Sequence, residues 1–363
     1  MTRVTSTIEM EAKLVKEIDR LGDGLRLIFL QHSRSGGNAL CSILYEEFFN
    51  QGIFKLGQVG STDHSFSDFL IDAKSTKSNI YMGHFSFGIH RHITGKYEYT
   101  TILRNPVERV LSAFLVNSSK TDSDIDRWIE NDFEASNGMV KRLCGFGYRD
   151  KSKAEIYDYE NDTMLKSMPS IGEKEFKRAC QNLDDYFPCV MINEYFAESL
   201  ALLKCHYDTR TLFSLTRQLY NHNPYKSTQS NFNDKTIQRI QELNYADIQL
   251  YDLYREKFKN KINQSDPILE IEIKFHREIS DLLSVRGTQI LGEHEVNQRI
   301  NNYIEHKIAL GFLDDAIELL RRFIAKPYVS QDYYESVLNF IKLHVSKEVF
   351  EKEERIFNDR FRF

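Results

Sequence analysis

Residues 25–40, LRLIFLQHSRSGGNAL, decide the fold. An apolar run of strand length, Leu25–Gln31, is closed by a Ser/Gly cluster, and the following NALCSILYEEFF carries apolar residues at helical spacing. This order of strand, loop and helix begins an α/β unit. Glycines let the loop backbone approach a ligand. The first N–H groups of the helix, those of Gly37, Asn38 and Ala39, and the helix dipole attract an anion. The stretch therefore predicts a phosphate site.

Five residues of this turn supply the groups that an anion needs. Gly36 and Gly37 allow the backbone to come close, and Arg34 supplies a planar cation. Ser35 and Asn38 supply hydrogen bonds. The turn is not a Walker A loop, because GxxxxGK[ST] is absent and no Lys-Ser/Thr pair exists to hold Mg²⁺. Taken alone, a Ser/Gly-rich turn after a strand can equally be an ordinary turn.

A second junction, ILRNPVERVLSAF over residues 102–114, places polar groups in a similar position. The predicted strand Tyr99–Leu103 ends just before Pro106, and proline is favoured at the first position of a helix. Arg104 leaves the carboxyl end of this strand, and Ser112 lies about two turns into the helix. The two side chains are predicted to bracket a second phosphate.

Further strand-like runs, Asn79–Phe85 and Cys189–Ile192, repeat the alternation of strand and helix. The expected fold is therefore α/β, with a parallel sheet flanked by helices on both faces. The pattern from Thr121 to Phe187 is otherwise polar and predicts mostly helix, and helical patterns fill nearly everything after Lys235.

The sequence divides into three predicted parts. These are a helical lead-in over residues 1–24, an α/β domain over 25–285 and an all-helical extension over 286–363. The extension is expected to pack either on the core or on a second copy of the chain. The second arrangement would make a homo-oligomer.

Composition excludes a non-specific nucleic-acid binder. Lys and Arg total 48 against 53 Asp and Glu, a net charge of -5, so a positive site must be local. No stretch resembles a signal peptide or a transmembrane segment. The five cysteines show no CxxC pair and lie in or beside apolar segments, which predicts reduced buried thiols and a cytoplasmic protein.

The two junctions resemble the phosphosulfate-binding signatures of sulfotransferases that use 3'-phosphoadenosine 5'-phosphosulfate (PAPS). The resemblance is to the carbohydrate type related to the heparan sulfate 2-O-sulfotransferases. His32–Asn38 is similar to the IPKTGGT of that family, and Leu103–Phe114 is similar to its LRDPVERxxSxY. Shorter similar segments follow the family's order: Gly83–Gly88 (GHxxF), Asn137–Leu143 (NxQTRxL), Val190–Leu200 (VGLxExFxxSL) and Asn244–Tyr251 (NxxDxxLY). Together they cover about residues 26 to 260.

The resemblance implies a P-loop NTPase-like fold and transfer of a sulfuryl group from PAPS to an acceptor hydroxyl, with a saccharide favoured as acceptor. It implies that residues 34–38 hold the 5'-phosphosulfate. Arg104 and Ser112 would hold the 3'-phosphate of PAPS and of the product, 3'-phosphoadenosine 5'-phosphate (PAP). Arg34 stands where the family has a catalytic lysine. Because arginine does not donate a proton near neutral pH, it would stabilise the leaving phosphate by charge and hydrogen bonds.

His84 leaves a strand end beside the first turn and is the predicted general base. A histidine at a strand end can also be purely structural. His32, His90 and His92 are nearby in the sequence and compete for the role. We interpret His90 and His92 as surface or acceptor-site residues.

Several further residues have assignments that depend on the fold. Lys226 and Ser227 lie in a loop that covers the nucleotide in the family, although such a loop is usually just solvated. Arg142 either lines the acceptor cleft or is a surface charge, and Glu194 is expected to cap the helix after its strand. Neither HExxH nor paired CxxC spacing is present, so metal-independent chemistry is predicted.

Two other functions remain open at this point. One is a different phosphate-ester or nucleotide enzyme with the same fold. The other is a catalytically weak nucleotide-binding or protein-interaction module. The absence of Mg²⁺-binding groups argues against a kinase, and the presence of Arg34, His84 and Arg104 together argues against an inactive cleft.

Overall fold

The computed structural model describes residues 24–277, with gaps at 48–52, 57–65, 76–77, 118–124, 126–127, 130–131, 151–154, 208–231, 265–268 and 275, together with residue 339. All but one residue of the predicted lead-in (1–24) and of the predicted extension (286–363) therefore lie outside the described residues. The predicted boundary near residue 285 lies outside them too.

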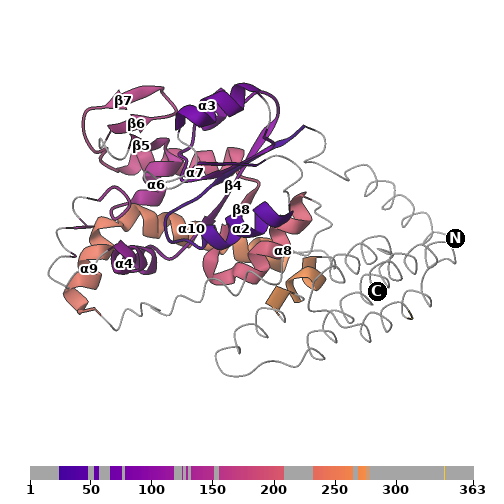
Figure 1. Cartoon of the computed structure of the whole chain (residues 1–363). Helices are drawn as coiled ribbons and strands as arrows, with labels where there is room; N and C mark the ends of the chain where they lie inside the picture. The colour runs from indigo at the N-terminus through magenta and orange to yellow at the C-terminus, as the bar shows by residue number, and fades with distance from the viewer. Residues whose placement is uncertain are drawn as a thin grey trace, which may run out of the picture.

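Five parallel strands form the central sheet, in the order β2-β3-β1-β4-β8 (Figure 1). The strands are β1 (Arg26–Leu30), β2 (Ile53–Leu56), β3 (Ile80–Gly83), β4 (Tyr97–Leu103) and β8 (Cys189–Ile192). All residues of β1 and β3 and the last five of β4 are buried, as a parallel sheet with two covered faces requires. The prediction of an α/β fold with a parallel sheet is confirmed. The sequence did not reveal β2, because four residues at the edge of a sheet give little periodicity.

Helices cover both faces of the sheet. After β1 comes α2 (Gly37–Glu47), after β4 comes α4 (Pro106–Asn117), and after β8 come a short 3-10 helix, η4 (Asn193–Tyr195), and α8 (Phe196–Tyr207). Between β2 and β3 lies α3 (Phe66–Ser75). Figure 1 shows α2 and α8 on one side of the sheet and α3 on the other. Pro106 is the first residue of α4, as the sequence predicts.

The strand order creates a switch point between β1 and β4. After β1 the chain builds β2 and β3 on one side of it, and then β4 and β8 on the other. In open parallel sheets, ligands bind outside the carboxyl ends of the strands where the winding reverses in this way. The carboxyl ends of β1 and β4 carry the two polar junctions found in the sequence.

The prediction that the stretch from residue 121 to 187 is mostly helical is wrong in its middle. It holds for α6 (Gly138–Leu143) and α7 (Glu173–Tyr186). Between them, β5 (Phe146–Asp150), β6 (Glu155–Asp158) and β7 (Thr163–Leu165) form an antiparallel sheet. Its backbone contacts the segment after β3, where Ser86 Oγ donates to the Phe146 carbonyl at 2.8 Å. Such tertiary contacts decide strand formation more than local composition does.

The last described helices pack against the core. They are α9 (Asp234–Leu243), α10 (Tyr245–Asn263) and the helical residues 269–274 and 276–277, which agree with the helical pattern after residue 235. One face of α10 buries Leu250, Tyr251, Tyr254 and Phe258, at the spacing of an amphipathic helix. Within the described ranges, no helix has the length and apolarity needed to cross a lipid bilayer.

None of the five cysteines, all of which are described, forms a disulfide. Cys41, Cys144 and Cys189 are buried, as predicted, but Cys205 is exposed. Burial raises the pKa of the Cys144 and Cys189 thiols to about 12. These two thiols are therefore protonated at neutral pH and are not nucleophiles.

Candidate functional site

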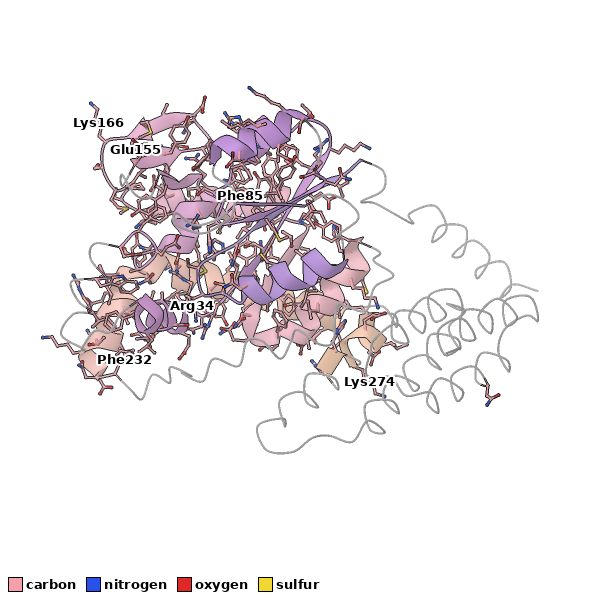
Figure 2. The ribbon with its side chains drawn as sticks, in the orientation of Figure 1. Arg34, Phe85, Glu155, Lys166, Phe232 and Lys274 are labelled. Atoms are coloured by element: carbon pink, nitrogen blue, oxygen red, sulfur yellow. The ribbon has the colours of Figure 1, made fainter. Side chains whose placement is uncertain are left out.

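The two polar junctions meet at the switch point. Arg104, the first residue after β4, donates from Nη1 to the backbone carbonyl of Arg34 at 2.9 Å. Arg34 donates from Nε to Ser112 Oγ, in α4, at 3.1 Å, across 78 residues of sequence. Figure 2 shows Arg34 between α4 and α2. Segments distant in sequence therefore form one polar site at the carboxyl edge of the sheet.

The loop after β1 presents backbone N–H groups. In the described part of the chain, the amides of Gly36, Gly37 and Asn38 donate no hydrogen bond, whereas Ala39 N–H bonds to the Gly36 carbonyl at 3.1 Å. The sequence suggested Gly37, Asn38 and Ala39 instead. The set is shifted by one residue because the bond from Ala39 to Gly36 closes the first turn of α2. Three consecutive N–H groups at a helix N-terminus form a suitable anion site.

Glycine is required at two positions of this loop. Gly36 has φ of 83°, and a Cβ there would lie 2.3 Å from Asn193 Oδ1. A Cβ at Gly37 would lie 2.4 Å from Gln31 Cγ. Arg34 also has a positive φ, 61°, which is uncommon for a residue with a side chain. Surrounding contacts hold this uncommon backbone conformation in place, among them the hydrogen bond of Arg104 to the Arg34 carbonyl.

We expect Gly36→Ala to destabilise the protein more than Gly24→Ala. Gly24 has φ of 77°, so both variants incur the left-handed penalty of about 1–2 kcal/mol. No described atom lies within 4 Å of a Cβ at Gly24, whereas a Cβ at Gly36 meets Asn193. Urea denaturation gives the two free energies of unfolding, and adding Asn193→Ala to Gly36→Ala should recover the difference. Equal losses in the two single variants would show that the close approach costs nothing.

Two half-buried guanidinium groups give the site its charge. Burial lowers the pKa of Arg34. Burial is also the largest cause of a lowered pKa at Arg104, where Glu108 and Glu194 act in the opposite direction and Arg34 adds to the lowering. Arg104 Nη2 lies 4.0 Å from Glu108 Oε2. Two neighbouring cations that are partly removed from water favour an anionic ligand between them.

The two polar side chains of the loop differ in accessibility. Asn38 is exposed, and its Oδ1 accepts a hydrogen bond from Gln31 Nε2 at 2.7 Å. Ser35 is fully buried, and its Oγ has no partner among the residues described. The hydroxyl of Ser35 is therefore not presented to solvent, unlike the amide of Asn38.

His84 lies beside this loop, directly after β3. Its Nδ1 lies 3.1 Å from the backbone carbonyl oxygen of Gln31, the residue that follows β1. Because a carbonyl only accepts, Nδ1 carries the proton of the neutral ring and Nε2 carries the lone pair. The half-buried ring is thus held in the tautomer that a general base needs.

The competing histidines are buried or packed against aromatic rings. His32 is fully buried, and burial followed by the charge of Arg142 lowers its pKa well below the ordinary value. His90 stacks on Tyr97 and Tyr186, with ring centroids 4.6 and 5.7 Å away, near the amino end of β4. His92 is half-buried with its ring edge-on to Phe66. Both rings are packed against aromatic side chains but stay partly exposed, so the interpretation of His90 and His92 as surface or acceptor-site residues stays a prediction.

Arg142 is neither a surface charge nor open to solvent. It is 6% exposed and donates to the backbone carbonyls of His84 and Phe85 and to the carboxylate of Glu134. The sequence did not indicate these partners. Glu134 carries no pattern of its own, and the carbonyls lie 58 and 57 residues away.

The turn after β8 also contributes to the site. Glu194 Oε1 accepts a hydrogen bond from the backbone N–H of Asn105 at 2.8 Å, so it supports the turn before α4 and does not simply cap its own helix. Asn193 lies against Gly36, a contact that sequence reasoning missed. Its only signal was its place at the end of a predicted strand.

Some predicted ligands are not placed. Lys226 and Ser227 fall in residues 208–231, outside the described residues. Within the described ranges, no group of three or more His, Cys, Asp or Glu side chains is arranged to hold a metal ion.

The fold and the site together define an α/β protein with a candidate anion-binding site at the carboxyl edge of a parallel sheet. No protein-family model matches the chain, and no curated protein matches it.

Proposed function

We propose that the protein is a PAPS-dependent sulfotransferase with a P-loop NTPase-like fold. The observation that carries the proposal is the contact of Arg104 with the loop of Arg34, which in turn contacts Ser112. An enzyme of this kind must bind two phosphate groups at opposite ends of one adenosine. Two cationic elements from separate strands, joined at the switch point, support that requirement.

In this proposal each element binds one end of the nucleotide. The N–H groups of residues 36–38 and the guanidinium of Arg34 bind the 5'-phosphosulfate. Arg104 and Ser112 bind the 3'-phosphate, which replaces the hydrogen bonds that both residues now make to Arg34. The phosphate groups would then act as polar, charged partners for two guanidinium groups that burial has partly removed from water.

The chemistry is an in-line displacement at sulfur. The acceptor oxygen attacks the sulfur atom while the bond from sulfur to the phosphate oxygen breaks. His84 Nε2 takes the proton of the attacking hydroxyl. The electron pair of the broken bond stays on the phosphate of PAP, where Arg34 stabilises the negative charge. The histidine then returns its proton to solvent, and PAP leaves.

The acceptor in this proposal is a saccharide hydroxyl, and the reaction takes place in the cytoplasm. Both statements rest on the sequence, through the resemblance to carbohydrate sulfotransferases and through the cysteine pattern. The -5 net charge supports a discrete anion site and not a broad nucleic-acid surface.

The test is a transfer assay with purified protein. PAPS labelled with ³⁵S is incubated with desulfated glycans and with fractions of a cell lysate, and both labelled product and PAP are measured. Equal amounts of labelled product and PAP, dependent on the protein, are expected. Tight PAP binding without transfer to any fraction would favour the alternative of a catalytically weak nucleotide-binding module.

A further inference from the structure

We propose that Arg142 and Glu134 are positioning residues that hold the backbone of His84, so that its ring faces the loop after β1. The inference rests on the proposed function, in which His84 is the general base. It gives a role to two buried charged residues that do not themselves touch the predicted ligands.

Arg142 clamps the segment that carries His84. Its Nη1 donates to the carbonyls of His84 and Phe85, at 2.7 and 3.1 Å. Its own backbone carbonyl accepts from Phe87 N–H at 2.9 Å. Figure 2 labels Phe85, the neighbour of His84, together with Arg34. One residue of α6 therefore holds both ends of the segment that follows β3, while the ring of His84 is held separately by the Gln31 carbonyl.

Glu134 in turn fixes the guanidinium of Arg142. Its Oε1 accepts from Arg142 Nε at 2.7 Å and also from Nη2. Burial alone would raise the pKa of Glu134, but Arg142 and Arg109 outweigh it and hold the pKa at about 2. The carboxylate is thus charged at every pH at which the enzyme would work. The Glu134 backbone is fixed as well, because its carbonyl accepts from Arg109 Nη2 at 2.7 Å.

A role in acceptor binding does not fit this geometry. The side chain of Arg142 is 7% exposed and that of Glu134 is 11% exposed. The three nitrogens of Arg142 are already used by two carbonyls and one carboxylate. A buried ion pair is weak evidence for stability, because apolar replacements are often neutral. The contact with the His84 backbone is the feature that gives this pair a specific task.

The first test compares Arg142→Lys with Lys141→Met. Lysine keeps the charge but cannot reach the carboxylate and both carbonyls at once. We expect kcat for sulfuryl transfer to fall about 10- to 100-fold, as misplacement of a reacting group does, with KM for the acceptor and Kd for PAP changed less than twofold. Lys141 lies on the same helix and is equally buried, but its Nζ donates to the Phe133 carbonyl at 3.3 Å. Its variant should keep kcat.

The second test needs no activity. In protein with ¹⁵N-labelled histidine, the His84 signals are assigned by their loss in His84→Gln. The wild type should show the Nδ1–H tautomer, Arg142→Lys should shift or mix it, and Lys141→Met should leave it unchanged. Glu134→Gln, which keeps the volume and one acceptor oxygen, should give the same change and serves if Arg142→Lys does not fold. This measurement tests the positioning role of Arg142 and Glu134 independently of the proposed function, because the His84 tautomer can be measured even if the wild type transfers no sulfuryl group.

Three results would overturn the inference. One is an unchanged His84 tautomer in folded Arg142→Lys or Glu134→Gln. Another is an equal loss of kcat in Lys141→Met, which would indicate general destabilisation. The third is a raised acceptor KM with unchanged kcat in Arg142→Lys, which would assign Arg142 to acceptor binding.

Discussion

His84→Ala is expected to lower the turnover of sulfuryl transfer by about 10²- to 10⁴-fold, the usual contribution of a general base. Nδ1–H faces the Gln31 carbonyl at 3.1 Å, so the lone pair lies on Nε2. Nε2 is therefore the atom that takes the proton of the attacking hydroxyl. Affinity for PAP should change little, because the predicted phosphate ligands lie on Arg34, Arg104 and their loops. Initial rates with ³⁵S-labelled PAPS give the turnover, and calorimetry gives the affinity.

The matched control for this variant is His206→Gln. His206 Nε2 lies 3.1 Å from Glu98 Oε2, near the amino end of β4 and away from the switch point. Its replacement should leave turnover unchanged. If His84→Ala retained full turnover, His84 would have no part in the mechanism. If it lost PAP affinity in proportion to turnover, His84 would belong to the nucleotide site.

Arg109→Met is expected to lower the free energy of unfolding by about 3–5 kcal/mol, the cost of breaking a buried ion pair. Arg109 has no exposed surface, and its Nη2 donates to Asp247 Oδ2 at 3.2 Å and to the Glu134 carbonyl. Burial is the main cause of a raised pKa at Asp247, and Arg109 opposes it. Without the arginine, the carboxyl group of Asp247 stays buried, and its remaining hydrogen-bond partners among the described residues are the backbone N–H groups of Met139 and Val140.

The loss should appear as a lower urea midpoint with an unchanged slope. Arg239→Met is the control, because Arg239 pairs with Glu242 at the surface, where both side chains are more than a third exposed. That change should stay within about 0.5 kcal/mol. A loss below 1 kcal/mol for Arg109→Met would show that the buried ion pair does not contribute this much to the free energy of unfolding.

The same cluster explains two segments singled out in the sequence. Asn137 Oδ1 accepts from the N–H groups of Ala246 and Asp247, and Asn244 Oδ1 accepts from Asn137 N–H. The start of α6 and the start of α10 thus cap each other. The asparagines and the aspartate of these segments hold helices together about 107 residues apart in sequence, and they do not enter the site.

Apart from β2, the strands of the main sheet could be predicted from the sequence. A run such as LRLIFLQ indicates a strand buried on both faces, and Pro106 indicates a helix start. Since the carboxyl ends of parallel strands share one edge, the two junctions meet there, and Arg104 contacts the backbone of Arg34. The chemical roles of these residues remain predictions.

The remainder depended on contacts that leave no local pattern. The strands of residues 146–165 show no clear alternation, and their backbone bonds to the segment after β3 through Ser86 and Phe146. For Arg142 the sequence left open an acceptor-cleft residue or a surface charge, since nothing nearby in sequence reveals its partners. Asn193 contacts the loop after β1, and Glu194 contacts the loop after β4. Both contacts depend on the strand order, which places β8 beside β4.

The central claim is that the two junctions bind opposite ends of one nucleotide, and calorimetry with PAP and adenosine 5'-phosphate tests it most directly. We expect the wild type to bind one PAP, more tightly than the nucleotide that lacks the 3'-phosphate. Arg104→Ala should lose about 10- to 100-fold in PAP affinity, the value of a charge-assisted hydrogen bond, and little affinity for adenosine 5'-phosphate. Equal PAP affinity in the wild type and in Arg104→Ala would contradict the claim.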